Sequence, residues 1–138
     1  MTEQAKNMTQ EQVAEWVRAQ LQKSSQFLAE KGIVVETVKM EESRYLAPWV
    51  TIWKVKSRDG KYYWAVSGDM PSDVLPLSAA KDPRAVLRHL SLNWQMKADD
   101  LQQSMPNDPT QQEFAKLLIT KAHLLYDISE QDEVWKHG

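Results

Sequence analysis

Three segments of the chain carry apolar residues at helical spacing. The first runs from about residue 10 to 31, behind a capping-box pair of Thr9 and Gln12, and ends before Gly32, which accepts the left-handed conformation. The other two start at Asp82-Pro83 and Asp108-Pro109, where a capping aspartate precedes a proline, and run to about residues 103 and 128. The pattern therefore predicts three helices, with a short capped helix after Ser129 that leads to Trp135.

Between the first two helices the spacing of apolar residues changes from that of helices to that of strands. Residues 33–40 are rich in β-branched side chains, and residues 49–66 form two alternating runs joined at Asp59-Gly60, a strong hairpin signal. Residues 41–45 are a polar break, and residues 67–82 a long connection. The order α-β-β-β-α-α predicts an α+β fold: a two-layer sandwich in which a three-stranded antiparallel meander carries its helices on one face. We expect a single domain over residues 9–138, after a disordered tail of residues 1–8.

The hairpin also predicts a register. A two-residue loop would oppose Val55 to Trp64 and Trp53 to Val66, because these pairs are equidistant from Asp59-Gly60. One face of the hairpin would then be apolar and aromatic, with Trp53, Val55, Tyr62, Trp64 and Val66. The other would carry Lys54, Lys56, Lys61 and Tyr63. This register assigns the tryptophans to the core rather than to a binding platform.

Composition narrows the function further. The 138 residues include no cysteine, so disulfides and thiolate metal sites are excluded. The first residues are polar and no apolar run reaches about 18 residues, so we expect neither a secretory signal nor a membrane span. A cytoplasmic location without membrane contact is expected. The net charge of -2 argues against nucleic acid as a partner, although the lysine-bearing sheet face is mildly basic.

Charged loop residues are the candidates for chemistry. In a simple meander the loop with Glu41, Glu42, Arg44 and Tyr45 lies at the same end of the sheet as the loop with Asp69 and Asp73. If they converge, their carboxylates, guanidinium and phenol could perform acid–base chemistry or hold a cationic ligand. The alternative is that these residues only pair locally and cap turns.

No other motif points to a reaction. The three histidines lack ligand spacing, and neither a nucleophile motif nor a glycine-rich phosphate loop is present, so we expect no catalytic residue, metal or cofactor.

The third helix has an apolar arc wider than one core-facing stripe. This predicts a central place in the core or self-association through Phe114, Leu117, Leu124 and Ile128. Lys121 interrupts the arc. Either its stem lies along the core while its ammonium reaches water, or the lysine is buried and paired with Glu42 or Asp69.

Three stretches carry a resemblance to a known family. They are residues 42–48 (ESRYLAP), 64–71 (WAVSGDMP) and 79–84 (AAKDPR). The chain resembles a small family of uncharacterised bacterial proteins of about this length, known as a domain of unknown function from gammaproteobacteria, from Trp16 onward. The resemblance implies a single cytoplasmic domain and assigns no functional residues.

Two hypotheses follow. The first is a non-enzymatic binding or adaptor module, homodimeric through the third helix or binding through the basic sheet face. The second is a small-molecule-binding protein or small enzyme with a pocket at the acidic and arginine-bearing loops. The lack of a nucleophile, metal or phosphate motif favours the first.

Overall fold

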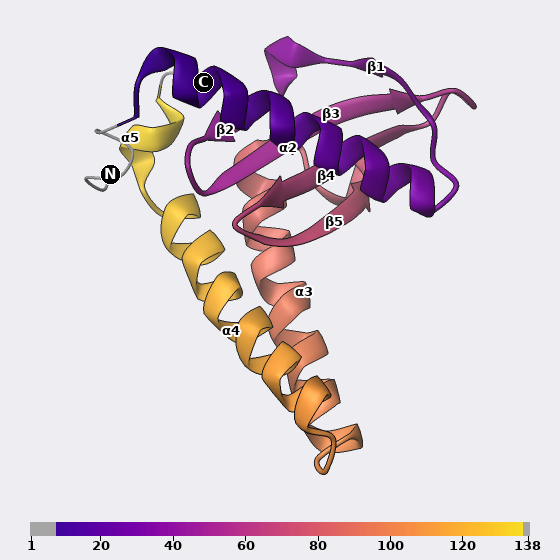
Figure 1. Ribbon diagram of the computed structural model, residues 1–138, viewed down its shortest axis with the longest axis vertical. Helices are drawn as coiled ribbons and strands as arrows, with labels where there is room; N and C mark the ends of the chain where they lie inside the picture. Colours follow the sequence, from indigo (N-terminus) through magenta and orange to yellow (C-terminus); the bar gives the residue numbers. More distant parts are fainter. Residues whose placement is uncertain (1–7, 137–138) are drawn as a thin grey trace. The chain divides into compact units, whose positions relative to one another are not determined.

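The computed structural model describes residues 8–136, so most of the predicted tail lies outside the described residues (Figure 1). The chain divides into two compact units at Pro83 and Arg84. The first contains a helix and an antiparallel sheet, and the second contains helices. Among the described residues, no helix combines the length and hydropathy needed to cross a bilayer.

The first helix, α2 (Gln10–Glu30), begins and ends as its sequence predicts. The Thr9 hydroxyl accepts a hydrogen bond from the Gln12 N–H (3.1 Å), and the Thr9 N–H donates to the Gln12 side chain (2.9 Å). At the other end Gly32 has φ +81°, and the Ile33 N–H donates to the Leu28 carbonyl, as in a Schellman motif. Both ends of α2 are therefore set by local sequence.

The sheet has five strands where the meander predicts three. They are β1 (Val35–Val38), β2 (Arg44–Leu46), β3 (Val50–Ser57), β4 (Tyr62–Gly68) and β5 (Met70–Pro76). All pairings are antiparallel in the order β1-β3-β4-β5, and β2 pairs with β3 beyond the end of β1. A mixed fold with an antiparallel sheet is thus confirmed, and the three-strand meander is wrong in its details.

The two additional strands lie where the sequence predicts a break and a loop. β5 contains Pro71 and Pro76, and proline is compatible with a strand only where its missing N–H faces away from a partner, as at this sheet edge. β2 is three residues long and follows the 3₁₀ turn η1 (Met40–Glu42). A second 3₁₀ turn, η2 (Leu77–Ala79), follows β5. Neither strand has the alternating pattern that identifies one from sequence.

The predicted hairpin register is wrong by one residue. Trp53 pairs with Ala65 and Lys54 with Trp64, so the two tryptophans lie on opposite faces of the sheet. The Ser57 N–H donates to the Lys61 carbonyl across a loop of three residues rather than two, and Gly60 has φ +90°. The loop is longer because the Asp59 carboxylate accepts from the Ser57 hydroxyl and the Lys61 N–H.

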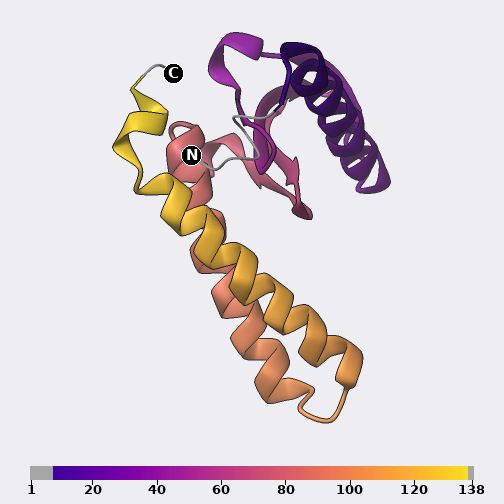
Figure 2. The same ribbon diagram turned by 60° about the vertical axis from the view of Figure 1, so that its left-hand side comes forward.

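In Figures 1 and 2 α2 lies along one face of the sheet, and the core of this unit lies between them. Leu28, Trp53, Val55 and Ala65 form its buried cluster. The placement of Trp53 in the core is therefore confirmed, and Trp64 is buried on the other face, where its indole N–H donates to the Ala80 carbonyl (2.9 Å). Both rings are buried despite the error in register.

Buried hydroxyls join α2 to the sheet beside this core. The Ser24 hydroxyl donates to the Ser67 hydroxyl (2.9 Å), which itself donates to the Gln20 carbonyl (3.1 Å). The Thr51 hydroxyl donates to the Ser67 carbonyl (3.1 Å). Because buried polar groups must be satisfied, these bonds define how far along the sheet the helix lies.

The second unit contains α3 (Pro83–Ser104), α4 (Pro109–Ser129) and the short α5 (Asp132–Trp135), which confirms the three predicted helical segments. α3 and α4 run antiparallel, side by side, in both views (Figures 1 and 2). The Ser91 hydroxyl donates to the Ala122 carbonyl (2.8 Å) between them. The Trp135 indole donates to the Ile128 carbonyl (3.1 Å), so α5 folds back on the end of α4.

Ion pairs connect the start of α3 to the segment that follows α4. Arg84 bonds both the Ser129 carbonyl and the Asp132 carboxylate at 2.6 Å, and Arg88 pairs with Glu130 at 2.9 Å. The hydrogen bond and charge of Arg84 hold the pKa of Asp132 below its ordinary value.

Candidate functional site

The acidic residues predicted at the first loop lie on the 3₁₀ turn before β2. Glu41 and Glu42 are both exposed, and the Glu42 carboxylate lies 3.0 Å from the Lys54 ammonium. Lys54 also lies over the Tyr62 ring, at 5.7 Å from its centroid. Glu42 thus takes part in a local ion pair at the sheet edge. This agrees with the alternative that the charged loop residues pair locally.

Arg44 and Asp73 are aligned but separated. Arg44 pairs with Ile52, Ile52 with Val66, and Val66 with Asp73, so the two residues lie in one row across the sheet with two strands between them. Three strand spacings put their Cα atoms roughly 14 Å apart. Arg44 and Asp73 therefore lie on opposite sides of the β3–β4 pair, in β2 and β5, rather than in two adjoining loops.

Tyr45 and Asp69 each line a different cavity of the first unit. Tyr45 in β2 is 48% exposed and lines a cavity of about 650 Å³ along α2. Asp69, in the turn between β4 and β5, is exposed and lines a cavity of about 660 Å³. The six predicted site residues thus lie apart: Glu41 is exposed on η1, Glu42 is in an ion pair, Arg44 and Asp73 are in one row of the sheet, and Tyr45 and Asp69 line two cavities. Their binding role stays a prediction.

The cavity at Tyr45 is mainly apolar, and we call it the apolar groove. One wall is formed by the first three turns of α2, and the others come from η1, β2 and the buried Trp53 of β3. Its lining residues are Met8, Gln10, Val13, Ala14, Val17, Arg18, Leu21, Met40, Tyr45 and Trp53. Met40 and Tyr45 are large apolar or aromatic side chains left about half exposed at its mouth, at 53% and 48%.

Trp53, which lines this groove, has a buried hydrogen-bond donor that no described residue satisfies. Its side chain is fully buried, yet its indole N–H has no hydrogen-bond acceptor among the described residues. A buried donor without a partner destabilises a protein by about 1–3 kcal/mol. By contrast, the N–H groups of Trp64 and Trp135 each donate to a backbone carbonyl.

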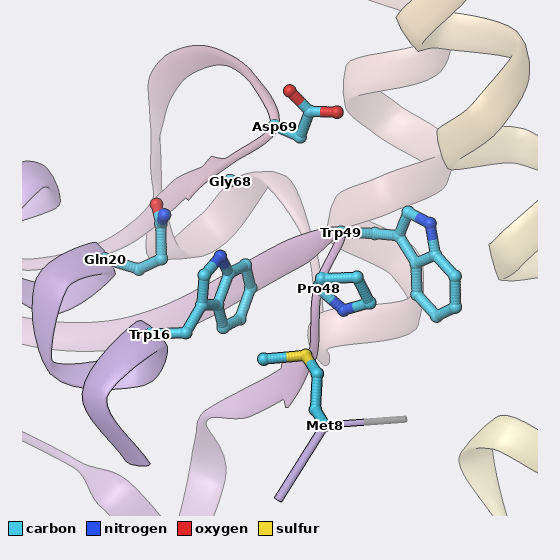
Figure 3. Close-up of a pocket in the computed structure, with 7 residues that line it drawn as sticks. All are labelled: Met8, Trp16, Gln20, Pro48, Trp49, Gly68 and Asp69. Atoms are coloured by element: carbon cyan, nitrogen blue, oxygen red, sulfur yellow. The ribbon is translucent and has the colours of Figure 1, made fainter. Parts of the chain in front are cut away.

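The cavity at Asp69 contains two tryptophans, and we call it the tryptophan pocket. Trp16 and Gln20 come from successive turns of α2, and Pro48 and Trp49 from the turn between β2 and β3. Gly68 is the last residue of β4, and Asp69 lies in the turn that follows it. Met8 completes the lining. In Figure 3 the Trp16 ring lies beside Pro48, with the Met8 side chain next to both.

Gly68 allows two segments of this pocket to meet. A Cβ atom at Gly68 would lie 2.1 Å from the Trp49 carbonyl oxygen, so no larger residue fits without moving the backbone. The Asp69 N–H donates to the same carbonyl (3.0 Å). The close approach at Gly68 therefore holds Trp49 beside Asp69.

Neither cavity follows from the sequence pattern alone, because Trp16, Trp49 and Trp53 are all explained by core packing. The available signal is the number of tryptophans, six in 138 residues. Among residues 8–136, no group of three or more His, Asp or Glu side chains is placed to hold a metal ion.

The predicted self-association residues lie along α4. Ile128 is buried and Leu125 beside it is fully buried, while Phe114 is half-buried with the Lys97 ammonium 5.5 Å from its centroid. Leu117 is 41% exposed, and Leu124 is half-buried. Lys121 is half-buried as well, and its pairing with Glu42 or Asp69 stays a prediction.

Comparison with known proteins shows which family the chain belongs to. No curated protein and no solved structure matches the chain. Residues 10–135 match the family described as Domain of unknown function (DUF4826), a span that begins with the first residue of α2 and ends with the last residue of α5. Because this match covers both units and nearly the whole chain, the protein belongs to the DUF4826 family.

Proposed function

We propose that this protein is a non-enzymatic binding module whose apolar groove takes a small apolar molecule with an oxygen acceptor. The observation that carries the proposal is the buried indole N–H of Trp53, which has no acceptor among the described residues and belongs to a residue that lines this mainly apolar cavity. Pockets for small molecules typically combine apolar walls with a few polar groups that orient the ligand.

The dimensions of the groove support a small ligand. A volume of about 650 Å³ falls within the range typical of small-molecule sites. Val13, Val17 and Leu21 are only half-buried, although they lie on the apolar stripe of α2. A ligand that covered them would gain roughly 25 cal/mol for each Å² of apolar surface removed from water.

The polar contact would come from Trp53. Because its side chain is fully buried, a ligand reaches the N–H only if neighbouring side chains move slightly. Met8 and Met40 line the groove and are flexible enough to allow this movement. A ligand oxygen would then satisfy the donor, and the protein would recover part of the free energy lost by burying it.

The charge of the groove favours an acid. Arg18 is the one charged residue in its lining, and its side chain is exposed on α2. A guanidinium at the rim attracts a carboxylate and is matched to it in geometry. We therefore assign the groove to aliphatic carboxylic acids rather than to alcohols or amines of the same length.

Titration with octanoate, octanol and octylammonium tests this assignment. We expect octanoate to bind most tightly and to move the Trp53 indole N–H resonance downfield in proton–nitrogen NMR spectra, because a hydrogen bond to oxygen forms. Tyr45→Ala should weaken binding about tenfold, since loss of a contacting aromatic ring removes about 1–2 kcal/mol. Tyr126→Ala, at a similarly exposed tyrosine of α4, is the matched control and should bind normally.

Two outcomes would contradict the proposal. One is that none of the three probes shifts the Trp53 resonance at millimolar concentration. The other is that Tyr45→Ala and Tyr126→Ala reduce binding equally, because the ligand would then bind outside the groove. The second hypothesis is a pocket formed by the loops that carry Glu41, Glu42, Arg44, Asp69 and Asp73. It is less well supported because two strands separate Arg44 from Asp73.

A further inference from the structure

We infer that the tryptophan pocket is a second binding site, separate from the apolar groove, that takes an organic ammonium ion. The two cavities share only Met8 among their lining residues and lie against different residues of α2. The inference rests on the chemistry of this pocket and is independent of what the groove binds.

The lining of the pocket includes an aromatic ring and a thioether, which are groups that interact favourably with cations or their alkyl parts. Trp16 contributes an indole ring, and the face of an indole attracts cations more strongly than those of the other aromatic residues. Trp49 also belongs to the lining, although Figure 3 shows its ring turned away from Trp16. Met8 contributes a polarisable thioether, and Figure 3 shows its sulfur near Trp16 and Pro48. Such a lining suits the alkyl part of an organic cation as well as its charge.

Gln20 provides an acceptor in the same pocket. Its side-chain oxygen is buried and has no hydrogen-bond donor among the described residues. A bound ammonium group with an N–H would satisfy this oxygen, whereas a quaternary ammonium could not. The acceptor therefore favours a primary or secondary amine over a quaternary one.

Two charged groups face this region, and they oppose each other. The Asp69 carboxylate is exposed at the rim and attracts a cation. The Lys23 ammonium donates to the Gly68 carbonyl (3.0 Å), one α2 turn beyond Gln20, and repels one. Asp69 belongs to the lining and Lys23 does not, so we assign the larger influence on a bound cation to the carboxylate.

The test compares three probes of similar size with the full-length protein. We expect butylammonium to bind more tightly than tetramethylammonium, and tetramethylammonium more tightly than 1-butanol, with the Trp16 and Trp49 indole resonances shifting in NMR spectra. Rising salt should weaken butylammonium binding, because an exposed carboxylate is screened.

Three substitutions test whether butylammonium binds in the tryptophan pocket. Asp69→Asn keeps the shape and removes the charge, and should weaken butylammonium binding about two- to fivefold. Trp16→Leu should weaken it by about threefold or more through loss of the ring. Asp73→Asn removes a carboxylate of the neighbouring strand that does not line the pocket, and should leave binding unchanged.

The inference is overturned if 1-butanol binds as well as butylammonium, if no probe shifts the Trp16 and Trp49 resonances, or if Asp69→Asn and Asp73→Asn act alike. Octanoate binding, measured on the same Asp69→Asn protein, reports separately on the apolar groove. The failure of one site is therefore distinguishable from the failure of the other.

Discussion

At the scale of single residues, the hairpin loop shows how one side chain can select a backbone conformation. The Asp59 carboxylate accepts hydrogen bonds from the Ser57 hydroxyl and from the Lys61 N–H (3.1 Å). The hydroxyl bond is the main reason that the pKa of Asp59 lies below its ordinary value of 3.8, since both bonds favour the charged form. Because the folded-state pKa is depressed, this contribution to stability is present above the ordinary pKa and is lost as the pH falls through the folded value.

Replacing the hydroxyl donor should therefore move this titration. In Ser57→Ala we expect the pKa of Asp59 to rise toward 3.8, as followed by NMR titration of its carboxyl group. The pKa of Asp132, which Arg84 depresses in the second unit, should stay unchanged and serves as the internal control. An unchanged Asp59 pKa would show that the Ser57 hydroxyl does not stabilise the charged carboxylate.

At the scale of elements, the close approach of β4 to the β2–β3 turn depends on a missing side chain. Gly68→Ala would place Cβ 2.1 Å from the Trp49 carbonyl oxygen and 2.9 Å from the Val50 Cα. Both are backbone atoms that cannot rotate away, so we expect a loss of about 2–4 kcal/mol in the free energy of unfolding. Urea denaturation measures this loss.

A second glycine provides the control for that substitution. Gly32 also has a positive φ, +81°, but an added Cβ would have no neighbour within 4 Å. Gly32→Ala should cost about 1 kcal/mol, from backbone strain alone. Equal losses in the two variants would mean that the contact with Trp49 is relaxed and contributes nothing beyond the conformational term.

At the scale of the whole molecule, the sequence predicts self-association through α4, and this prediction is still untested. Of the four residues proposed for it, Leu117 is exposed, while Ile128 is already buried within the chain. Phe114 and Leu124 are half-buried, so part of their area is also covered within the chain, whereas a stable interface needs roughly 800 Å² per partner. We therefore expect only weak dimerisation, with a dissociation constant above about 1 μM.

Sedimentation equilibrium over a range of concentrations measures this association. Leu117→Glu should abolish the dimer, because a charge would be buried at its centre. Thr120→Glu, at an exposed polar position of the same helix, should not change the sedimentation behaviour. If both variants and the unmodified chain sediment alike as monomers, the α4 surface is not a dimer interface.

Some features of the candidate sites could be expected from sequence and some could not. Tyr45 and Asp69 are predicted site residues that do line cavities, because polar and aromatic residues in connections tend to lie at the surface. Their expected convergence with Arg44 and Asp73 depends on a three-strand meander. The additional edge strands β2 and β5 place Arg44 and Asp73 at opposite edges of the sheet.

The sequence by itself determined the helices and their ends. Capping at Thr9 and Asp108, the proline after Asp108 and the glycine after α2 act within a few residues, so their effects can be read without knowledge of the fold. It also determined that Trp53 is buried, since a large ring in an alternating strand packs in the core under either register.

Only the tertiary structure decided the register, the edge strands and the two cavities. The register depends on one residue of loop length, which the bonds of Asp59 select. β5 is a strand only because β4 offers a partner, and the proline-containing sequence has little strand preference of its own. The cavities form where α2 meets chain segments distant in sequence, and such gaps arise from packing between surfaces rather than from any local pattern.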